Sequence, residues 1–203
     1  MAFLPAQRIE ARATDIWQRF GLQPGFDVER VIDLLGLQLL WEEVDDDVGG
    51  RVLGQLVPAQ KLVVLNERHL GLLEEKGGRL RRYTVGHEIG HWELHADDVR
   101  SGTLSLFSND RLWCRDGSAH PAERQAEMFA AALLMPRAEL LDGLPPRGWS
   151  GWRPVYGLCD QFVVNATPMM IRLEQLRFAH RDDLGVPHSG PKPAIGQNAL
   201  FDP

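Results

Sequence analysis

The chain has 203 residues, of which 44% are hydrophobic and 25% charged, and its formal net charge is −6 at pH 7. This composition suits one ordinary folded domain and argues against a chain dominated by disorder. The acidic balance gives no general attraction to nucleic acid or anionic membrane, and no apolar run approaches the roughly 18 residues of a membrane helix. With two cysteines, no disulfide framework and no secretory signal, we expect a cytoplasmic location.

The first part of the chain predicts helices followed by a small sheet. Within residues 6–36, apolar spacing and capping residues indicate one helix at 6–20 and a short one at about 27–35. The sheet region, 37–66, contains three Leu- and Val-rich segments separated by turn signals, at 37–44, 51–57 and 62–66. Because their connections are too short for parallel crossovers, we expect three antiparallel strands in a meander.

The second part predicts helices interrupted by one irregular segment, residues 98–119, which is long enough to be functional. The expected helices span 79–97, 120–135 and, within 152–178, about 154–163 and 167–178. Residues 182–203 are rich in Pro and Gly and should form an extended tail. We therefore expect a single α+β domain over residues 1–181, followed by this tail.

The motif that carries chemistry is His87-Glu88-x-x-His91, inside the expected helix 79–97. Residues four apart on a helix share a face, so both imidazoles can reach one zinc ion. Glu88 is turned by about 100° from His87. Its carboxylate can therefore act as a general base on water beside the metal instead of joining the ligands. The structural alternative is a helix with two surface histidines and an acidic neighbour.

A catalytic zinc site usually has three protein ligands, so a third must come from elsewhere. One subclass of zinc proteases continues the motif with a glycine and a third histidine, but Leu94 and Asp97 stand at those positions. The expected helix 120–135 offers Glu123 and Glu127 on one face, with small alanines that would allow close packing. The residues alone leave open which glutamate binds, or whether both are solvated.

Two stretches together resemble a known family. Arg-Arg-Tyr-Thr-Val-Gly-His-Glu-Ile-Gly-His, residues 81–91, is followed some thirty residues later by Glu-x-x-Ala-x-x-Phe-Ala-Ala-x-Leu-Leu-Met-Pro, residues 123–136. This pair is similar to the ImmA/IrrE family of metallopeptidases, and the resemblance extends over about 26–178. It implies a zincin-like fold with a three-stranded antiparallel sheet packed against the motif helix and a second, ligand-bearing helix.

The resemblance also implies a set of site residues: zinc ligands at His87, His91 and Glu123, and a catalytic glutamate at Glu88. Two positions depart from the common pattern of the family. Gly86 stands where alanine is common, and Glu127 stands where asparagine is common.

Glu127 therefore stays in consideration as an alternative ligand or as a hydrogen-bond partner of a ligand. His95 continues the i, i+4 series and has the same two possible roles. A donor for the transition-state oxyanion is left open among Tyr83, Tyr156 and His120.

The function implied by the resemblance is zinc-dependent cleavage of a protein, a transcriptional repressor, which would derepress its genes. We expect no membrane partner and no direct contact with nucleic acid. One rival function is DNA binding by a helix-turn-helix within 156–178, where Arg172 and Arg177 flank Glu174 among apolar residues that indicate a packed core. The other rival is a zinc-containing interaction or toxin module that does not hydrolyse its partner, against which Glu88 argues.

Overall fold

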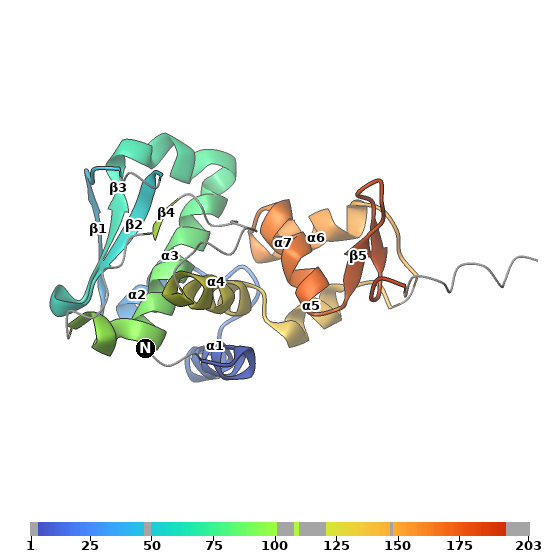
Figure 1. Cartoon of the computed structure of the whole chain (residues 1–203), viewed down its shortest axis with the longest axis horizontal. Helices are drawn as coiled ribbons and strands as arrows, with labels where there is room; N and C mark the ends of the chain where they lie inside the picture. Colours follow the sequence, from blue (N-terminus) through green and yellow to red (C-terminus); the bar gives the residue numbers. More distant parts are fainter. Residues whose placement is uncertain (1–3, 47–49, 101–107, 110–120, 147, 194–203) are drawn as a thin grey trace, which may run out of the picture. The chain divides into compact units, whose positions relative to one another are not determined.

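The computed structural model describes residues 4–46, 50–100, 108–109, 121–146 and 148–193 (Figure 1). Two compact units can be separated, residues 1–136 and residues 137–203. The division falls within residues 1–181, and each unit contains buried apolar side chains. No helix of the described residues is both long enough and apolar enough to cross a membrane.

Two helices open the first unit, as the apolar spacing predicted. The first, α1 (Ala6–Phe20), ends at Gly21, whose φ of 59° gives the left-handed cap that glycine adopts most easily. Trp17 of α1 donates a hydrogen bond from its indole Nε1 to the carbonyl of Leu133 at 2.6 Å. The second, α2 (Val28–Leu34), begins after Asp27, whose side chain accepts from the backbone N–H of Glu29 at 3.0 Å.

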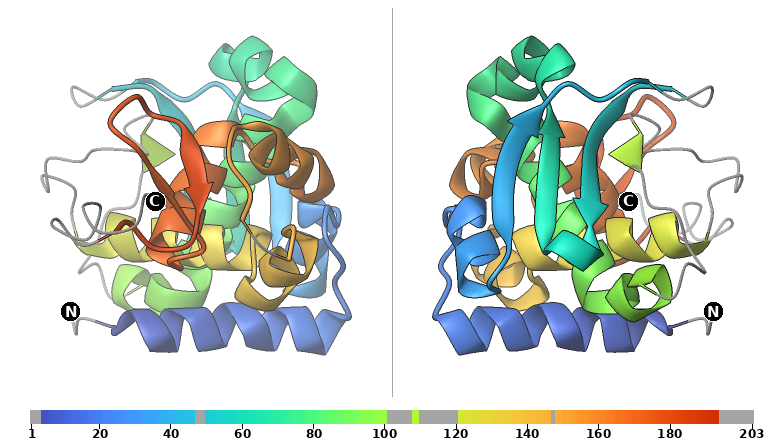
Figure 2. Two further views of the ribbon diagram at one scale, coloured as in Figure 1. Left: turned by 90° about the vertical axis from the view of Figure 1, so that its right-hand side faces the viewer. Right: turned by 90° about the vertical axis from the view of Figure 1, so that its left-hand side faces the viewer.

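The sheet contains β1 (Gln38–Glu42), β2 (Val52–Val57), β3 (Leu62–Asn66) and the two-residue β4 (Ser108–Asn109), in the order β1-β3-β2-β4. The predicted antiparallel meander is wrong. β3 pairs with β2 in antiparallel fashion but with β1 in parallel, and the right-hand view of Figure 2 shows β1 and β3 pointing the same way.

The length of the link between β1 and β2 explains the mixed sheet. That link, residues 43–51, has to span two strand spacings, about 10 Å, well within the reach of a chain that extends about 3.3 Å per residue. β3 can therefore enter between β1 and β2. All five of its residues are buried, as suits an inner strand, while β1 alternates between exposed and half-buried positions at the edge.

Asn66 at the end of β3 ties the sheet together. Its buried side-chain oxygen accepts from the N–H groups of Val44 and Arg68, both at 3.1 Å. Its amide nitrogen donates to the carbonyls of Val44 at 2.8 Å and Val52 at 2.7 Å. These four bonds match the two donor and two acceptor positions of an asparagine amide. They hold the end of β1 close to the start of β2.

The motif helix lies in α3 (Leu70–Arg100). Its backbone leaves the helical conformation from Glu75 to Gly78, and Gly77 and Gly78 have φ values of 72° and 71°. The second helical segment therefore begins at residue 79, as predicted. The ligand-bearing helix predicted at 120–135 is confirmed as α4 (Pro121–Leu134). Contacts place α3 between the sheet and α4.

Glycines allow α3 and α4 to meet at backbone distance. A Cβ built at Gly90 would lie 2.9 Å from the carbonyl oxygen of Ala126 and 3.0 Å from its Cα. A Cβ at Gly86 would lie 3.3 Å from Cδ1 of Leu134. The departure from alanine at Gly86 thus serves helix packing, as does Gly90 between the two histidines.

The second unit contains α5 (Arg137–Gly143), α6 (Arg153–Phe162), α7 (Ala166–Gln175) and a hairpin of β5 (Ala179–Arg181) and β6 (Pro187–Ser189), with Ser150 bridged to His188 of β6. The turn and the second strand of this hairpin lie within the expected tail, residues 182–203, because Asp182 accepts from the N–H groups of Leu184 and Val186 and so fixes the turn.

Replacing Gly90 with alanine should lower the free energy of unfolding, because the added methyl group meets the backbone of α4. Overpacking of this kind costs about 1–3 kcal/mol, more than the gain in helix propensity of about 1 kcal/mol. Gly71→Ala is the matched control, since Gly71 also lies in α3 and a Cβ there meets nothing within 4 Å. Urea unfolding of both variants measures the effect, and equal stability of the two would contradict the close packing.

Candidate metal centre

Three side chains predicted from sequence converge between α3 and α4. Nε2 of His87 lies 3.1 Å from one carboxylate oxygen of Glu123, and Nε2 of His91 lies 3.3 Å from the other. The ligand atoms of all three residues lie within 4.8 Å of one another. Both histidines are buried, whereas the side chain of Glu123 is 23% exposed, so the group reaches the surface on the side of Glu123.

This group fits a zinc ion. Zinc binds imidazole nitrogen and carboxylate oxygen at about 2.0–2.2 Å in tetrahedral geometry, which separates neighbouring ligand atoms by about 3.4 Å. The two nitrogen–oxygen distances already have nearly this spacing. Two histidines and one glutamate are also a donor set that catalytic zinc sites use. The three residues could therefore hold a zinc ion with little rearrangement.

Burial and charge oppose each other at the site. Burial disfavours the charged form of His87, but its hydrogen bond with Glu123 and the nearby negative charges outweigh this effect and raise the pKa of His87. Burial would likewise raise the pKa of Glu123, yet hydrogen bonds to both histidines hold it well below its usual value. In the absence of a metal, these residues therefore favour an imidazolium paired with a carboxylate.

Glu88 occupies a different side of α3. It is fully buried, and its Oε1 lies 3.5 Å from the position that a Cβ would have on Gly54 of β2. The histidines meet α4, whereas Glu88 meets the sheet, as its offset of about 100° from His87 requires. Glu88 is therefore beside the three-residue group and outside it.

The other two predicted site residues do not join the group formed by His87, His91 and Glu123. His95 is buried, with its ring centroid 5.9 Å from that of His91. Burial, reinforced by the charge of Glu123, raises the pKa of Glu127 to about 7. Within the described part of the chain, Nδ1 of His87 donates no hydrogen bond to Glu127.

The residues that precede the motif fix α3 to neighbouring elements. Arg81 pairs with Glu29 of α2 at 2.5 Å. The guanidinium of Arg82 donates to the carbonyl of Phe26 and lies 4.6 Å from the centroid of its ring. Tyr83 donates from its hydroxyl to the backbone oxygen of Glu127 at 3.4 Å, so this oxyanion-donor candidate is engaged with α4.

Tyr156 and His120 are the other two oxyanion-donor candidates. Tyr156 lies in the second unit, and His120 lies outside the described residues, as does most of the 98–119 stretch.

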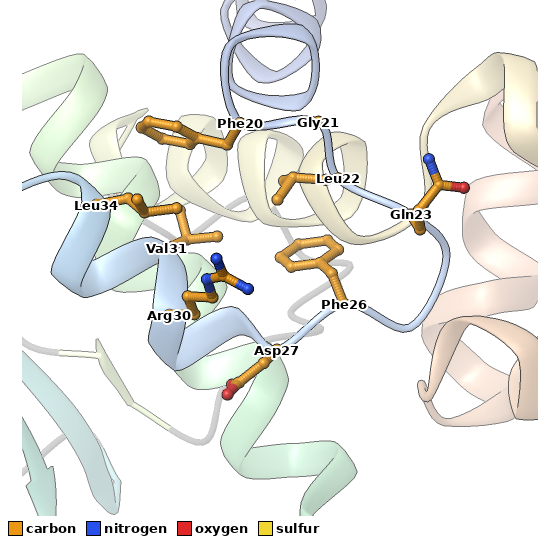
Figure 3. Close-up of a pocket in the computed structure, with 9 residues that line it drawn as sticks. All are labelled: Phe20, Gly21, Leu22, Gln23, Phe26, Asp27, Arg30, Val31 and Leu34. Atoms are coloured by element: carbon orange, nitrogen blue, oxygen red, sulfur yellow. The ribbon is translucent and has the colours of Figure 1, made fainter.

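A surface pocket of about 390 Å³ exists at the junction of α1 and α2 (Figure 3). It is lined mainly by Phe20, Leu22, Phe26, Val31 and Leu34. None of the motif residues lines it, so it is separate from the metal group.

Sequence reasoning missed Gly54, which contacts the region of Glu88. A signal was available, because an isolated glycine inside the expected strand 51–57 marks a bulge or a close approach of another element. The structure shows both features. The register of β2 with β4 shifts between Val52 and Gly54, and α3 passes directly over Gly54.

Glu127→Gln should make the stability of metal-free protein less dependent on pH. The pKa of Glu127 is 4.5 in its ordinary state and about 7 in the folded protein, because burial disfavours the charged carboxylate. The folded protein therefore loses stability as the pH rises from 4.5 to about 7. The variant should therefore gain stability relative to wild type between pH 5 and pH 8. Urea unfolding at both pH values, with Glu42→Gln as an exposed control, measures this gain. A constant difference between variant and wild type would contradict it.

Comparisons with known proteins agree with the geometry of the site. Residues 60–151 match the family model of the IrrE N-terminal-like domain, Peptidase M78. Among solved structures, a Mycobacterium tuberculosis transcriptional regulator is similar, with a TM-score of 0.51 and 15% identity. That match covers 88% of this chain but 53% of the regulator, so the chain spans about half of its length. At this identity, the likeness concerns the fold alone.

A search of curated proteins finds no significant match to the chain. The family match nevertheless includes all four residues of the site, from His87 in α3 to Glu123 in α4. It confirms the resemblance that the two motifs indicated. Over residues 60–151, the chain is similar to the ImmA/IrrE family of metallopeptidases.

Proposed function

We propose that this protein is a zinc-dependent endopeptidase with a zincin-like arrangement of its site. His87, His91 and Glu123 hold the zinc ion, and Glu88 is the general base. The observation that carries the proposal is the convergence of two imidazole nitrogens and one carboxylate within 4.8 Å, with a second, buried carboxylate on the adjacent face of the same helix. The family match over residues 60–151 supports the reaction class.

The bound metal and Glu88 have separate roles in peptide hydrolysis. A bound zinc ion supplies Lewis-acid polarisation of the peptide carbonyl and lowers the pKa of water from about 15.7 toward about 7. Glu88 accepts a proton from the attacking water and then gives it to the leaving amine. Its contacts with the sheet hold its carboxylate near the ligands without competing for their places. Glu123, the most exposed of the ligands, marks the side from which a substrate enters.

A protein that regulates transcription is the substrate class that we propose. This proposal rests on the family resemblance. The similar Mycobacterium tuberculosis protein is itself described as a transcriptional regulator. Cleavage of a repressor would release its target genes. The net charge of −6 would also favour encounter with the basic surface of a DNA-binding protein.

DNA binding by the helix pair α6–α7 finds less support. Arg172 is buried, with 3% of its surface exposed, so it is not available to phosphates. Glu174 forms a bidentate ion pair with Arg181, at 2.8 and 2.7 Å, so the charge of Arg181 is already neutralised by a carboxylate. Among the described residues of this helix pair and its flanks, Arg153 at the start of α6 and Arg177 after α7 are the exposed arginines. Two cations at opposite ends of the pair are a weak basis for phosphate contact.

The decisive test is cleavage of a transcriptional repressor encoded next to this gene, with Glu88→Gln as the inactive variant and the exposed Glu75→Gln, also in α3, as control. Wild type and Glu75→Gln should cut the repressor when zinc is present. Glu88→Gln should retain zinc but lose activity by at least about 100-fold. Mass spectrometry of the fragments identifies the bond that is cut.

The alternatives give different results in the same experiment. Equal cleavage by wild type and Glu88→Gln would remove Glu88 as the general base. Stoichiometric zinc without any cleavage would support the non-hydrolytic interaction or toxin module. Salt-dependent affinity for DNA without cleavage would support the helix-turn-helix regulator.

A further inference from the structure

The sheet has a glycine, which lacks a side chain, at the point where it packs against the motif helix in α3. Gly54 of β2 is buried and pairs with Leu65 of β3. A Cβ built on Gly54 would lie 2.8 Å from Cγ2 of Thr84 and 3.5 Å from Oε1 of Glu88. The first distance is shorter than any ordinary contact between carbon atoms. Any side chain at this position would therefore force α3 or its side chains to move.

Thr84 has little freedom to give way. It is fully buried, and its hydroxyl donates to the carbonyl of Leu80 at 3.1 Å, which fixes its rotamer. The helix also cannot retreat from the sheet, because Gly90 on its other side is in contact with the backbone of α4. α3 is thus held at backbone distance on both sides, and strain introduced at Gly54 would fall on Thr84 and on its neighbour one turn later, Glu88.

We propose that Gly54 is a positioning residue for Glu88. By lacking a side chain, it leaves the space in which Thr84 and the carboxylate of Glu88 lie against the sheet. The metal ligands on α3, His87 and His91, meet α4 instead, so a change at Gly54 should move the base without removing the metal. The inference rests on the proposed function as far as catalysis is concerned, but the position of Glu88 can be measured without a substrate.

Four variants separate positioning from general damage: Gly54→Ala, Thr84→Ser, the double variant, and Gly71→Ala. Thr84→Ser deletes the methyl group that the new Cβ would strike and keeps the hydroxyl that bonds to Leu80. Gly71→Ala adds a methyl group to α3 where nothing lies within 4 Å. Zinc affinity, measured by competition with a chromogenic chelator, should stay within about twofold of wild type in Gly54→Ala, because its ligands are untouched.

The rate of repressor cleavage by each variant gives the first readout. Gly54→Ala should lower kcat by at least about 10-fold, as expected for a misplaced catalytic group, with KM within about twofold. The double variant should return to within about threefold of Thr84→Ser alone, and Gly71→Ala should match wild type. A folded double variant that remains as slow as Gly54→Ala would overturn the proposal. If Gly54→Ala fails to fold, the comparison of the double variant with Thr84→Ser decides the question.

Carbon-13 NMR of protein labelled at the glutamate side-chain carboxyl gives the second readout and needs no substrate. The signal that disappears in Glu88→Gln is that of Glu88. It should shift in Gly54→Ala, return most of the way in the double variant and stay in place in Gly71→Ala. An unmoved signal in Gly54→Ala would overturn the positioning role. A moved and restored signal, in a protein that cleaves no repressor, would support the role of Gly54 while the proposed peptidase function fails.

Discussion

The close approach of one helix to its neighbours on both sides is the constraint on which the site depends. Helix axes normally lie 8–10 Å apart, depending on the side chains between them. Gly90 removes that side chain on the side of α4, so Glu123 can reach the two histidines. Gly54 removes it on the side of the sheet, so Glu88 can lie against β2. Positions without side chains thus set the geometry of the reactive groups.

The same tight packing concentrates charge in a buried space. Glu88 is buried, and Glu123 and Glu127 are half-buried around histidines that are almost fully enclosed. Without a cation, the site holds protons instead, and the pKa values of His87 and Glu127 are raised accordingly. A divalent cation would replace these protons and offset the negative charge directly. Metal binding, protonation and the contact between α3 and α4 are therefore linked in one equilibrium.

The elements near the site were largely predictable from sequence, because their signals are local. The start of the motif helix was indicated by Gly77 and Gly78, and the shared face of His87 and His91 follows from helix geometry. The mixed sheet was not predictable, because strand periodicity does not say which edge a returning strand joins. The choice of Glu123 over Glu127 depends on how α4 is rotated against α3, which the residues alone left open. The contact at Gly54 joins distant segments and left only the weak signal of a glycine within a strand.

The central claim is that α3 and α4 together bind one zinc ion. The most direct measurement is an anomalous difference map, collected at the zinc absorption edge from crystals of zinc-loaded protein. One strong peak per chain is expected, about 2.0–2.2 Å from Nε2 of His87, from Nε2 of His91 and from a carboxylate oxygen of Glu123. No peak between these three side chains, or a peak held by other residues, would contradict it.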